Sequence, residues 1–303
     1  MHYTLHQLKI FVKVADLQSI TKAAEDLHLT QPAISIQLKK LQEQFDLPLT
    51  EVIGRQLYVT DFGKEIAVRS RRILDEADGI KYTIDQHKGL LTGKIKISVV
   101  STGKYVIPYF LKDFMDTYPG VEISIDVSNK NRVIKGLYQN ESDFSLVSVV
   151  PDDLNVFTVE LMDNQLNLVG NSEYKDRIKR PKDLEKVTLL FREKGSATRN
   201  AMEEYLESKK IKLNKSMEFV SNEAVKQAIN AGLGVSIVPL IGLRTALEYE
   251  DFTLLPLPGL PIITRWNLIY NKGKSLTPAQ LELIKYMEEN KVQLAEKHFS
   301  WAK

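Results

Sequence analysis

The spacing of apolar residues changes near residues 89–94, and this change divides the chain into two parts. From Leu5 to Leu91 apolar residues recur at three- and four-residue intervals, which is typical of helices that pack on one face. From Lys94 onward short β-branched runs alternate with helical stretches, a pattern that predicts an α/β fold. A length of 303 residues is enough for two or three domains.

Composition excludes several classes of protein. The 43% of hydrophobic residues can build buried cores. Cysteine is absent, which excludes disulfides, thiolate metal sites and cysteine nucleophiles. The opening MHYTLHQLKIFVKV lacks the order of a signal peptide, and no later stretch reaches about 18 uncharged apolar residues. We therefore expect a cytoplasmic protein that does not associate with a membrane.

The segment 19–45 predicts a helix-turn-helix. A short helix begins at Ala23, His28 and Leu29 form a tight connection, and Thr30 can cap a longer second helix with Pro32 in its first turn. The buried face of this second helix is formed by Ile34, Leu38, Leu41 and Phe45. Its front carries small or flat side chains, which would let it approach base edges in a major groove about 12 Å wide. These side chains are Gln31, Ala33, Ser35 and Gln37.

Helical periodicity alone leaves open a helical domain that does not bind DNA, because amphipathic stripes and capped helices are common. The next stretch, IGRQLYVTDFG, favours DNA binding: it predicts a turn at Gly54 and Arg55, a short strand over Leu57–Thr60 and a new helix start at Thr60 or Asp61. A turn and strand in this place form a wing. Residues 1–93 carry 12 Lys or Arg and 12 Asp or Glu, so their formal charge is zero and any basic surface must be local.

The run SITKAAEDLHLTQPAISIQLKKLQEQFDLPLTEVIGRQLYVTDFGKEI, residues 19–66, resembles the winged helix-turn-helix of LysR-type transcriptional regulators, and the resemblance extends through the whole chain. The matching positions are Ala23, Ala24, Gln31, Pro32, Ala33, Ser35, Leu41, Leu49, Arg55, Thr60 and Gly63. Thr50 stands where the family usually has Phe, Val52 where it usually has Arg, and Ile36 where it often has a basic or polar residue. The wing phrase, residues 51–63, is similar to the subgroup that controls carbon-fixation genes.

The resemblance also implies which residues contact DNA. Gln31 would lie in the groove and could bond an adenine edge, whereas Lys39 and the wing residue Arg55 would hold phosphates without reading sequence. Ile36 could meet a thymine methyl group or merely pack. The candidate DNA-binding set is Thr21, Thr30, Gln31, Pro32, Ser35, Ile36, Lys39 and Arg55. Lys40 is as well explained by a solvated helix face.

Residues 61–91 predict one long helix with an apolar seam of heptad spacing. One set of seam positions is Ile66, Ile73, Ile80 and His87, and the companion set is Ser70, Ala77, Ile84 and Leu91. A helix of about 30 residues with so narrow a stripe needs a partner helix. The resemblance implies that such linker helices pair between subunits, so we expect a homodimer or a homotetramer. The candidate dimer seam is Ile66, Ile73, Ala77, Ile80 and Ile84.

From residue 93 onward, alternating strands and helices predict an effector region of two Rossmann-like lobes with mostly parallel sheets, similar to periplasmic binding proteins. Strands are expected at 94–100, 121–127 and 144–150, a second set runs over 165–265, and the segment 277–299 is a final helix. We expect a winged helix-turn-helix at 1–60, a linker helix at 61–92 and an effector domain at 93–303. Lobe I would comprise about 93–164 and 270–303, and lobe II about 165–269.

Polar residues follow the expected strands at the edge where a cleft between the lobes would open. Several hydroxyls together with free helix N–H groups suit a carboxylate or phosphate. The candidate effector-binding set is Ser101, Thr102, Ser128, Asn129, Ser148, Ser196, Thr198, Ser221 and Asn222. Arg192 is a possible counter-charge, and Arg199 another, although it could equally serve the fold. Ser and Thr before helices are more often N-caps than ligand contacts, so the prediction depends on their convergence in one crevice.

These features predict a sequence-specific transcriptional regulator whose operator binding or DNA bending is changed by a small anionic metabolite between the lobes. The expected partners are double-stranded operator DNA, the effector, further copies of the chain and RNA polymerase; no cofactor or metal is expected. One alternative is a constitutive DNA-binding regulator without an effector, and another is a solute-sensing module without DNA specificity. An enzyme is disfavoured because His298 is the only histidine beyond residue 93 and no Ser-His pair, HExxH or Walker motif is present there.

Overall fold

The computed structural model describes residues 2–54, 56–87, 89–152, 154–249 and 252–302, which form two compact units. Unit 1 comprises Met1–Gly93 with the short segments Tyr138–Glu141 and Ser275–Pro278. Unit 2 comprises Lys94–Leu137, Ser142–Lys274 and Ala279–Lys303. Within the described ranges, every helix is too short or too polar to cross a lipid bilayer.

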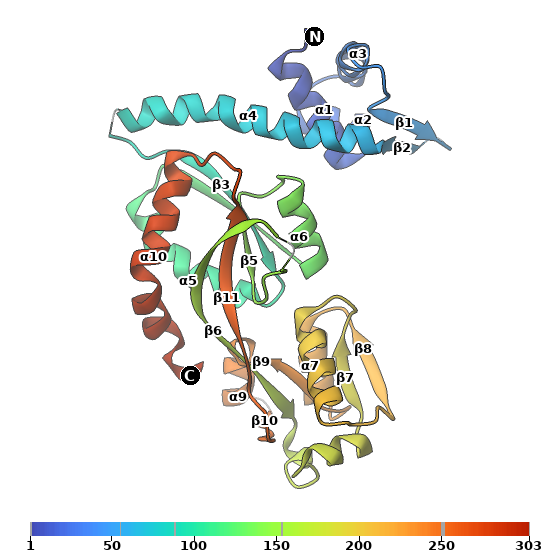
Figure 1. The fold of residues 1–303 in the computed structure, drawn as a ribbon, viewed down its shortest axis with the longest axis vertical. Helices are drawn as coiled ribbons and strands as arrows, with labels where there is room; N and C mark the ends of the chain where they lie inside the picture. Colours follow the sequence, from blue (N-terminus) through green and yellow to red (C-terminus); the bar gives the residue numbers. More distant parts are fainter. Residues whose placement is uncertain (1, 55, 88, 153, 250–251, 303) are drawn as a thin grey trace. The chain divides into compact units, whose positions relative to one another are not determined.

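The elements of unit 1 follow the predicted order (Figure 1): α1 (Leu5–Leu17), α2 (Ile20–Asp26), α3 (Gln31–Gln42), β1 (Thr50–Ile53), β2 (Gln56–Val59) and α4 (Asp61–His87). Thr30 caps α3 as predicted, because its hydroxyl accepts a hydrogen bond from the Ala33 amide at 3.4 Å. Ser19 caps α2 in the same way through the Lys22 amide at 3.3 Å. Three residues of the predicted buried face of α3 are buried and Phe45 packs against them, so the helix-turn-helix prediction is confirmed at the level of structure.

The wing is an antiparallel pair in which Thr50 of β1 lies opposite Val59 of β2. The strand β2 turns Leu57 and Val59 inward, whereas Val52 and Ile53 of β1 are 69% and 59% exposed. At the start of the next helix, the Thr60 hydroxyl accepts a hydrogen bond from the Gly63 amide at 2.9 Å. Of the two predicted cap residues, Thr60 and Asp61, Thr60 is therefore the one that caps this helix.

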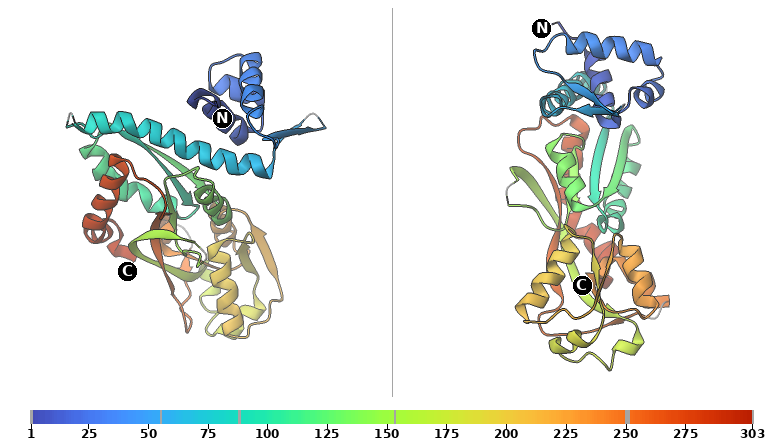
Figure 2. Two further views of the ribbon diagram at one scale, coloured as in Figure 1. Left: turned by 45° about the horizontal axis from the view of Figure 1, so that its top comes forward. Right: turned by 90° about the vertical axis from the view of Figure 1, so that its right-hand side faces the viewer.

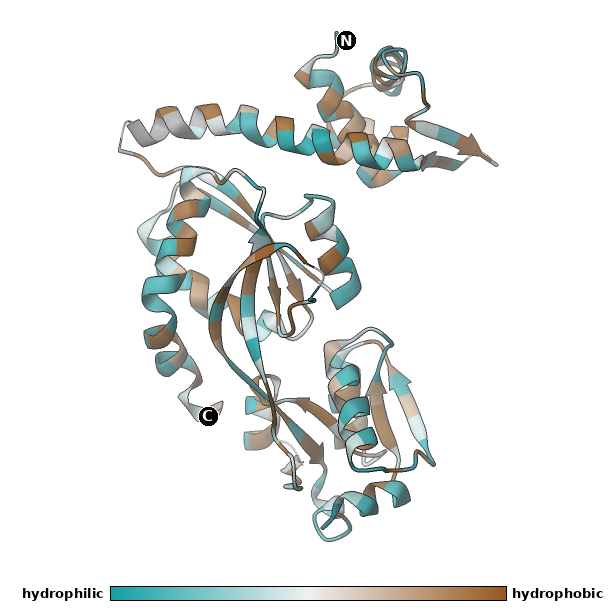
Figure 3. Cartoon of the chain, in the orientation of Figure 1, coloured by the Kyte–Doolittle hydropathy of each residue, from teal (hydrophilic) through white to brown (hydrophobic). Residues whose placement is uncertain are grey.

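The candidate seam residues lie on the helix α4, whose apolar residues recur along its length (Figure 3). Ile66 is half-buried against the helix-turn-helix core, while Ile73, Ile80 and Ile84 are exposed. The side chain of His87 lies outside the described part of the chain. A single copy of the chain therefore leaves most of the candidate seam without apolar cover.

Unit 2 holds the remaining elements. Those of the first lobe are β3 (Gly93–Val100), α5 (Ile107–Thr117), β4 (Val121–Ser128), α6 (Lys130–Tyr138), β5 (Phe144–Val147) and α10 (Pro278–Phe299). Those of the second lobe are β7 (Leu189–Arg192), α7 (Ala197–Ser208), β8 (Ser216–Phe219), α8 (Asn222–Asn230), β9 (Ser236–Pro239), α9 (Arg244–Tyr249) and β10 (Thr253–Leu254). Two long strands, β6 (Val156–Gly170) and β11 (Ile262–Asn271), run through both lobes (Figure 1).

The sheet pairing is mixed rather than mostly parallel. The strand order is β10-β6-β11-β5-β3-β4, with β9 also pairing β6, and β7 and β8 form a separate parallel pair. β3 and β5 are parallel, but β6 and β11 are antiparallel because the chain enters the second lobe along one and returns along the other. The sequence pattern missed the first half of β6, which lies before the expected boundary at residue 165.

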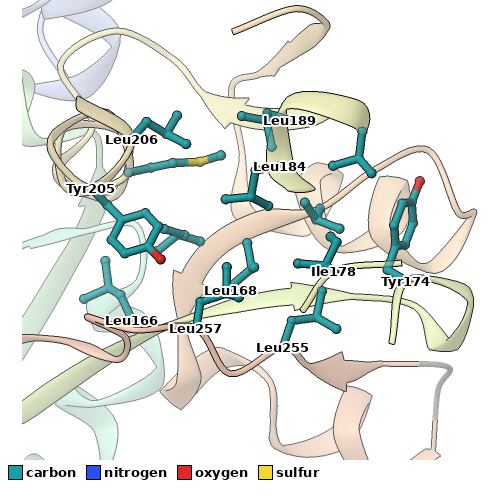
Figure 4. Packing of buried hydrophobic residues seen from close by; sticks show 14 of the residues in the cluster. Leu166, Leu168, Tyr174, Ile178, Leu184, Leu189, Tyr205, Leu206, Leu255 and Leu257 are labelled. Carbon is teal, nitrogen blue, oxygen red and sulfur yellow. The ribbon is translucent and has the colours of Figure 1, made fainter. Parts of the chain in front are cut away.

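Buried apolar clusters fix the helices that carry the pocket residues described below. In the second lobe, Leu206 of α7 packs with Leu168 of β6 and Leu189 of β7 (Figure 4). In the first lobe, α10 packs along α5, where the Phe110 and Phe299 rings lie 6.1 Å apart; both helices can be followed in Figure 2. The first turn of α7 is therefore held at a fixed place beside the end of β7.

Candidate DNA-binding surface and interlobe pocket

Most of the candidate DNA-binding residues lie at the surface of α2 and α3. The exposed ones are Thr21, Thr30, Gln31, Pro32, Ile36 and Lys39, and Ser35 is half-buried. The Thr30 hydroxyl is engaged by its own helix as a cap, so Thr30 positions α3. Arg55 lies outside the described residues. Lys39 and Lys40 are both exposed, and neither forms an ion pair within the described part of the chain.

Gln37 departs from the expected front of α3. Its Oε1 accepts a hydrogen bond from the buried side-chain amide of Gln7 at 3.2 Å, so this half-buried side chain is turned toward α1. The physical reason is helical geometry: Gln37 follows buried Ile34 by three residues and therefore lies toward the same side. The front of α3 that remains free is smaller and centres on Gln31, Ser35 and Ile36.

A pocket between the lobes gathers six of the nine candidate effector-binding residues. These six are Ser101, Thr102, Asn129, Ser148, Ser196 and Thr198. Ser101 and Thr102 follow β3, Ser148 follows β5, and Ser196 and Thr198 belong to the start of α7, so both lobes contribute. Lys130, Arg192 and Glu193 also line the pocket. The sequence singled out Arg192 only as a possible counter-charge and missed Lys130 and Glu193, although each directly follows a singled-out residue.

The other three candidates lie away from the pocket lining. Ser221 accepts a hydrogen bond from the Ala224 amide at 3.1 Å, so it is an N-cap, the more common role for such a residue. Asn222 supports the pocket from behind, because its side-chain amide donates to Ser101 Oγ at 3.2 Å and its carbonyl accepts from Arg192. Ser128 is half-buried at the end of β4 and does not reach the lining.

Arg192 is the charged centre of the pocket, and its side chain is only 2% exposed. Its Nη2 donates to Ser101 Oγ at 3.3 Å, which joins the two lobes. Its Nε and Nη2 also donate to the two carboxylate oxygens of Glu193 at 2.8 and 2.9 Å. The neighbouring glutamate thus occupies the fork of the guanidinium that a carboxylate or phosphate would use. The remaining cavity is about 20 Å³, room for about one water molecule.

A second polar contact joins the lobes at Glu223 of α8. Its carboxylate accepts a hydrogen bond from the Tyr105 hydroxyl and lies 3.3 Å from Lys104 Nζ and 2.8 Å from Lys226 Nζ. Burial raises the pKa of Glu223, but the hydrogen bonds from Lys226 and Tyr105 outweigh it and lower the pKa to about 2. Because this pKa is depressed in the folded chain, the contact stabilises the structure above pH 4.5 and its contribution is lost as the pH falls toward about 2.

Comparison with known proteins shows the family to which the chain belongs. A model described as "Bacterial regulatory helix-turn-helix protein, lysR family" matches residues 5–64, and one described as "LysR substrate binding domain" matches residues 88–291. The transcriptional activator CmpR of Synechocystis sp. is 34% identical over 287 residues, covering 94% of each chain. A RuBisCO operon transcriptional regulator of Acidithiobacillus ferrooxidans is 35% identical over 289 residues, again covering 94% of each chain.

A solved structure extends the comparison to the lobes. The regulatory domain of CcmR from Synechocystis PCC6803, determined in complex with 2-PG, superposes with a TM-score of 0.62 at 28% identity, covering 65% of this chain and 97% of that domain. The predicted family and fold class are thereby confirmed. The chain belongs to the LysR family of transcriptional regulators, with an N-terminal helix-turn-helix and a C-terminal effector-binding region.

Proposed function

We propose that this chain binds operator DNA through α3 and the wing, and that a small anion bound between the lobes changes that binding. The observation that carries the proposal is Arg192: a buried guanidinium stands where β7 ends, beside the start of α7 and hydroxyl groups of the opposite lobe. A planar fork, a helix N-terminus and nearby hydroxyls together favour a carboxylate or phosphate over a neutral solute.

The chemistry of the relatives supports this choice of effector. The CcmR regulatory domain was solved with 2-PG, and two related full-length regulators are named for activation of transcription or for the RuBisCO operon. Lys130, which lines the same pocket, adds a second positive charge from the first lobe. We therefore take 2-PG as the first probe and carbon-fixation genes as the first candidate targets. We assign no catalytic step to the chain.

The proposed mechanism uses the two strands β6 and β11 as the connection about which the lobes move. An effector that binds one lobe arrangement more tightly would shift the population toward it, and a coupling of about 1 to 3 kcal/mol is enough for a useful change in operator affinity. We propose that the seam Ile66, Ile73, Ala77, Ile80 and Ile84 pairs two chains, that dimers join as tetramers, and that the assembly contacts RNA polymerase. We also propose that the DNA-binding domain ends at residue 60 and that the linker helix ends at residue 92.

Selection of bound fragments from genomic DNA tests the proposed function. We expect a small set of enriched fragments that share two half-sites about one helical turn apart. Titration of 2-PG with and without an enriched fragment should then give different affinities, because coupling between two sites is reciprocal. Equal, easily salt-washed retention of every fragment would refute sequence-specific binding. Equal affinities in the two titrations would refute control through binding.

Lys39→Ala should reduce the dependence of operator affinity on salt without changing which operator is preferred. A lysine that holds one phosphate releases about one counterion, so the slope of log affinity against log salt should fall by about one unit. Gln31→Ala should have the opposite pattern of effects. The dependence of operator affinity on salt should stay the same, and the preference for one operator sequence over another should be lost. Lys40→Ala is the matched control, since Lys40 is exposed on the same turn. Equal slopes for Lys39→Ala and the unsubstituted protein would remove Lys39 from the phosphate contacts.

Glu193→Gln should raise the affinity for 2-PG by about tenfold, because an anion must otherwise displace the Glu193 carboxylate from Arg192 and approach a like charge. Calorimetric titration measures the change, with Glu204→Gln on the exposed side of α7 as the control. A fall in affinity instead would mean that Glu193 orients Arg192 for the effector and does not compete with it.

A further inference from the structure

The second lobe contains another hollow, separate from the interlobe pocket and lined by residues of α7 and β8. These two elements can be followed in Figure 1. The volume of the hollow is about 380 Å³, within the range of small-molecule sites and far larger than the interlobe pocket in this structure. Its apolar lining comes from Phe191, Leu206, Ile211, Leu213 and Met217. Phe191 and Leu206 are buried, whereas Leu213 and Met217 are exposed, so the hollow has a closed apolar floor and an open apolar rim.

The polar lining of this hollow is acidic. Three carboxylates, those of Glu203, Glu207 and Glu218, stand against one cation, Arg199, so the formal charge of the lining is −2. Arg199 is already engaged: its Nε donates to Glu203 at 2.7 Å and its Nη1 to Glu218 and to the Arg192 carbonyl at 2.9 Å. Glu207 makes no ion pair within the described part of the chain. An anionic ligand would find no free positive charge there.

We infer that this hollow is a second small-molecule site and that it binds an organic cation with an apolar body. The apolar floor would cover the body of the ligand, and the ammonium group would lie at the rim against Glu207 and the outer oxygens of Glu203. The ligand class is opposite in charge to the anion proposed for the interlobe pocket. The inference does not depend on the proposed function, because it stands on the shape and charge of another surface.

The two sites share structural elements, which gives the second site a physical route to the first. Phe191 lines the hollow and the next residue, Arg192, lines the interlobe pocket. The helix α7 likewise contributes Thr198 to the pocket and Arg199 to the hollow. Arg199 donates a hydrogen bond to the Arg192 carbonyl, so a ligand that draws Glu203 or Glu218 away from Arg199 would act through Arg199 on the backbone of Arg192.

Binding can be tested with 3-phenylpropylamine, 3-phenylpropanol and 3-phenylpropanoate, which have the same apolar body and differ in charge. The full chain carries six methionines, so methyl-¹³C methionine labelling gives few signals. Met217 in the hollow and Met115 on α5 are 41% and 43% exposed, which makes Met115 an internal control. We expect the amine to shift the Met217 signal saturably and to leave Met115 unchanged, with a much weaker effect of the alcohol and none of the carboxylate.

Glu207→Gln should lower the affinity for the amine by about threefold to tenfold, which is the size expected for losing one partly solvated charge contact. Glu204→Gln on the outer side of the same helix should leave the amine affinity unchanged. Either an absent or unsaturable Met217 shift, or equal shifts with all three probes, would overturn the inference. So would equal weakening by the two glutamine variants, since that result would show only a general electrostatic attraction to the lobe.

Discussion

Arg192→Met is expected to lower the affinity for 2-PG by at least about 100-fold. Charge-assisted hydrogen bonds contribute roughly 1.5 to 3 kcal/mol each, and loss of two bonds from one guanidinium fork therefore exceeds the ~2.7 kcal/mol that corresponds to 100-fold. Methionine replaces the aliphatic stem of Arg192 and carries no charge, so it removes the guanidinium of a side chain that is only 2% exposed. Calorimetric titration of the full chain measures the loss.

Two companion variants separate the charge of Arg192 from its place in the fold. Arg192→Lys keeps the charge but loses the planar fork, so it should bind more weakly than the unsubstituted chain and more tightly than Arg192→Met. Arg265→Met removes an exposed arginine that pairs with Glu160 at 2.7 Å, and surface pairs of this kind contribute little. Unchanged 2-PG affinity in folded Arg192→Met would show that the effector does not use the interlobe guanidinium.

Gly63→Ala is expected to destabilise unit 1 by about 3 kcal/mol, as over-packing of a tight contact does, and to abolish operator binding with it. A Cβ atom at Gly63 would lie 2.0 Å from the Leu49 carbonyl oxygen. That carbonyl is already fixed, because it accepts a hydrogen bond from the Thr60 amide at 3.1 Å. Backbone rather than a flexible side chain must therefore move. Chemical denaturation of the full chain, followed by a signal from unit 1, measures the effect.

Gly79→Ala in the same helix is the matched control for Gly63→Ala. A Cβ atom at Gly79 would meet nothing within 4 Å, so only helix propensity changes, and α4 should gain up to about 1 kcal/mol. The change in the free energy of unfolding should therefore have opposite signs in the two alanine variants. Equal small effects would mean that the Leu49 carbonyl can shift without cost and that the wing junction is not a tight contact.

Local chemistry made the DNA-binding part predictable from sequence. Thr30 and Thr60 are small polar residues directly before apolar periodic runs, and each is found capping the helix that follows. Gln37 was misjudged because its partner, Gln7, lies 30 residues earlier in the sequence. A side chain with the right shape for a groove can instead satisfy a buried amide, and the sequence does not distinguish the two.

The interlobe pocket was predictable only in outline. Hydroxyl residues after strands converge because strand ends meet at one edge of a sheet, and six of nine candidates do line the pocket. The role of Arg192 could not be derived in the same way, since it depends on Ser101 of the other lobe and on the adjacent Glu193. The antiparallel crossing of β6 and β11 was also missed, because the pairing partners lie about 100 residues apart.

The wing has a consequence for a bacterium under osmotic stress. Such a cell accumulates potassium, and every contact between a cation and a DNA phosphate weakens as it does so. The strand β1, Thr50–Ile53, contains neither lysine nor arginine and presents exposed Val52 and Ile53. In the proposed complex, apolar contact of β1 with DNA would release no counterions, so this part of the binding would depend less on salt than the Lys39 contact does.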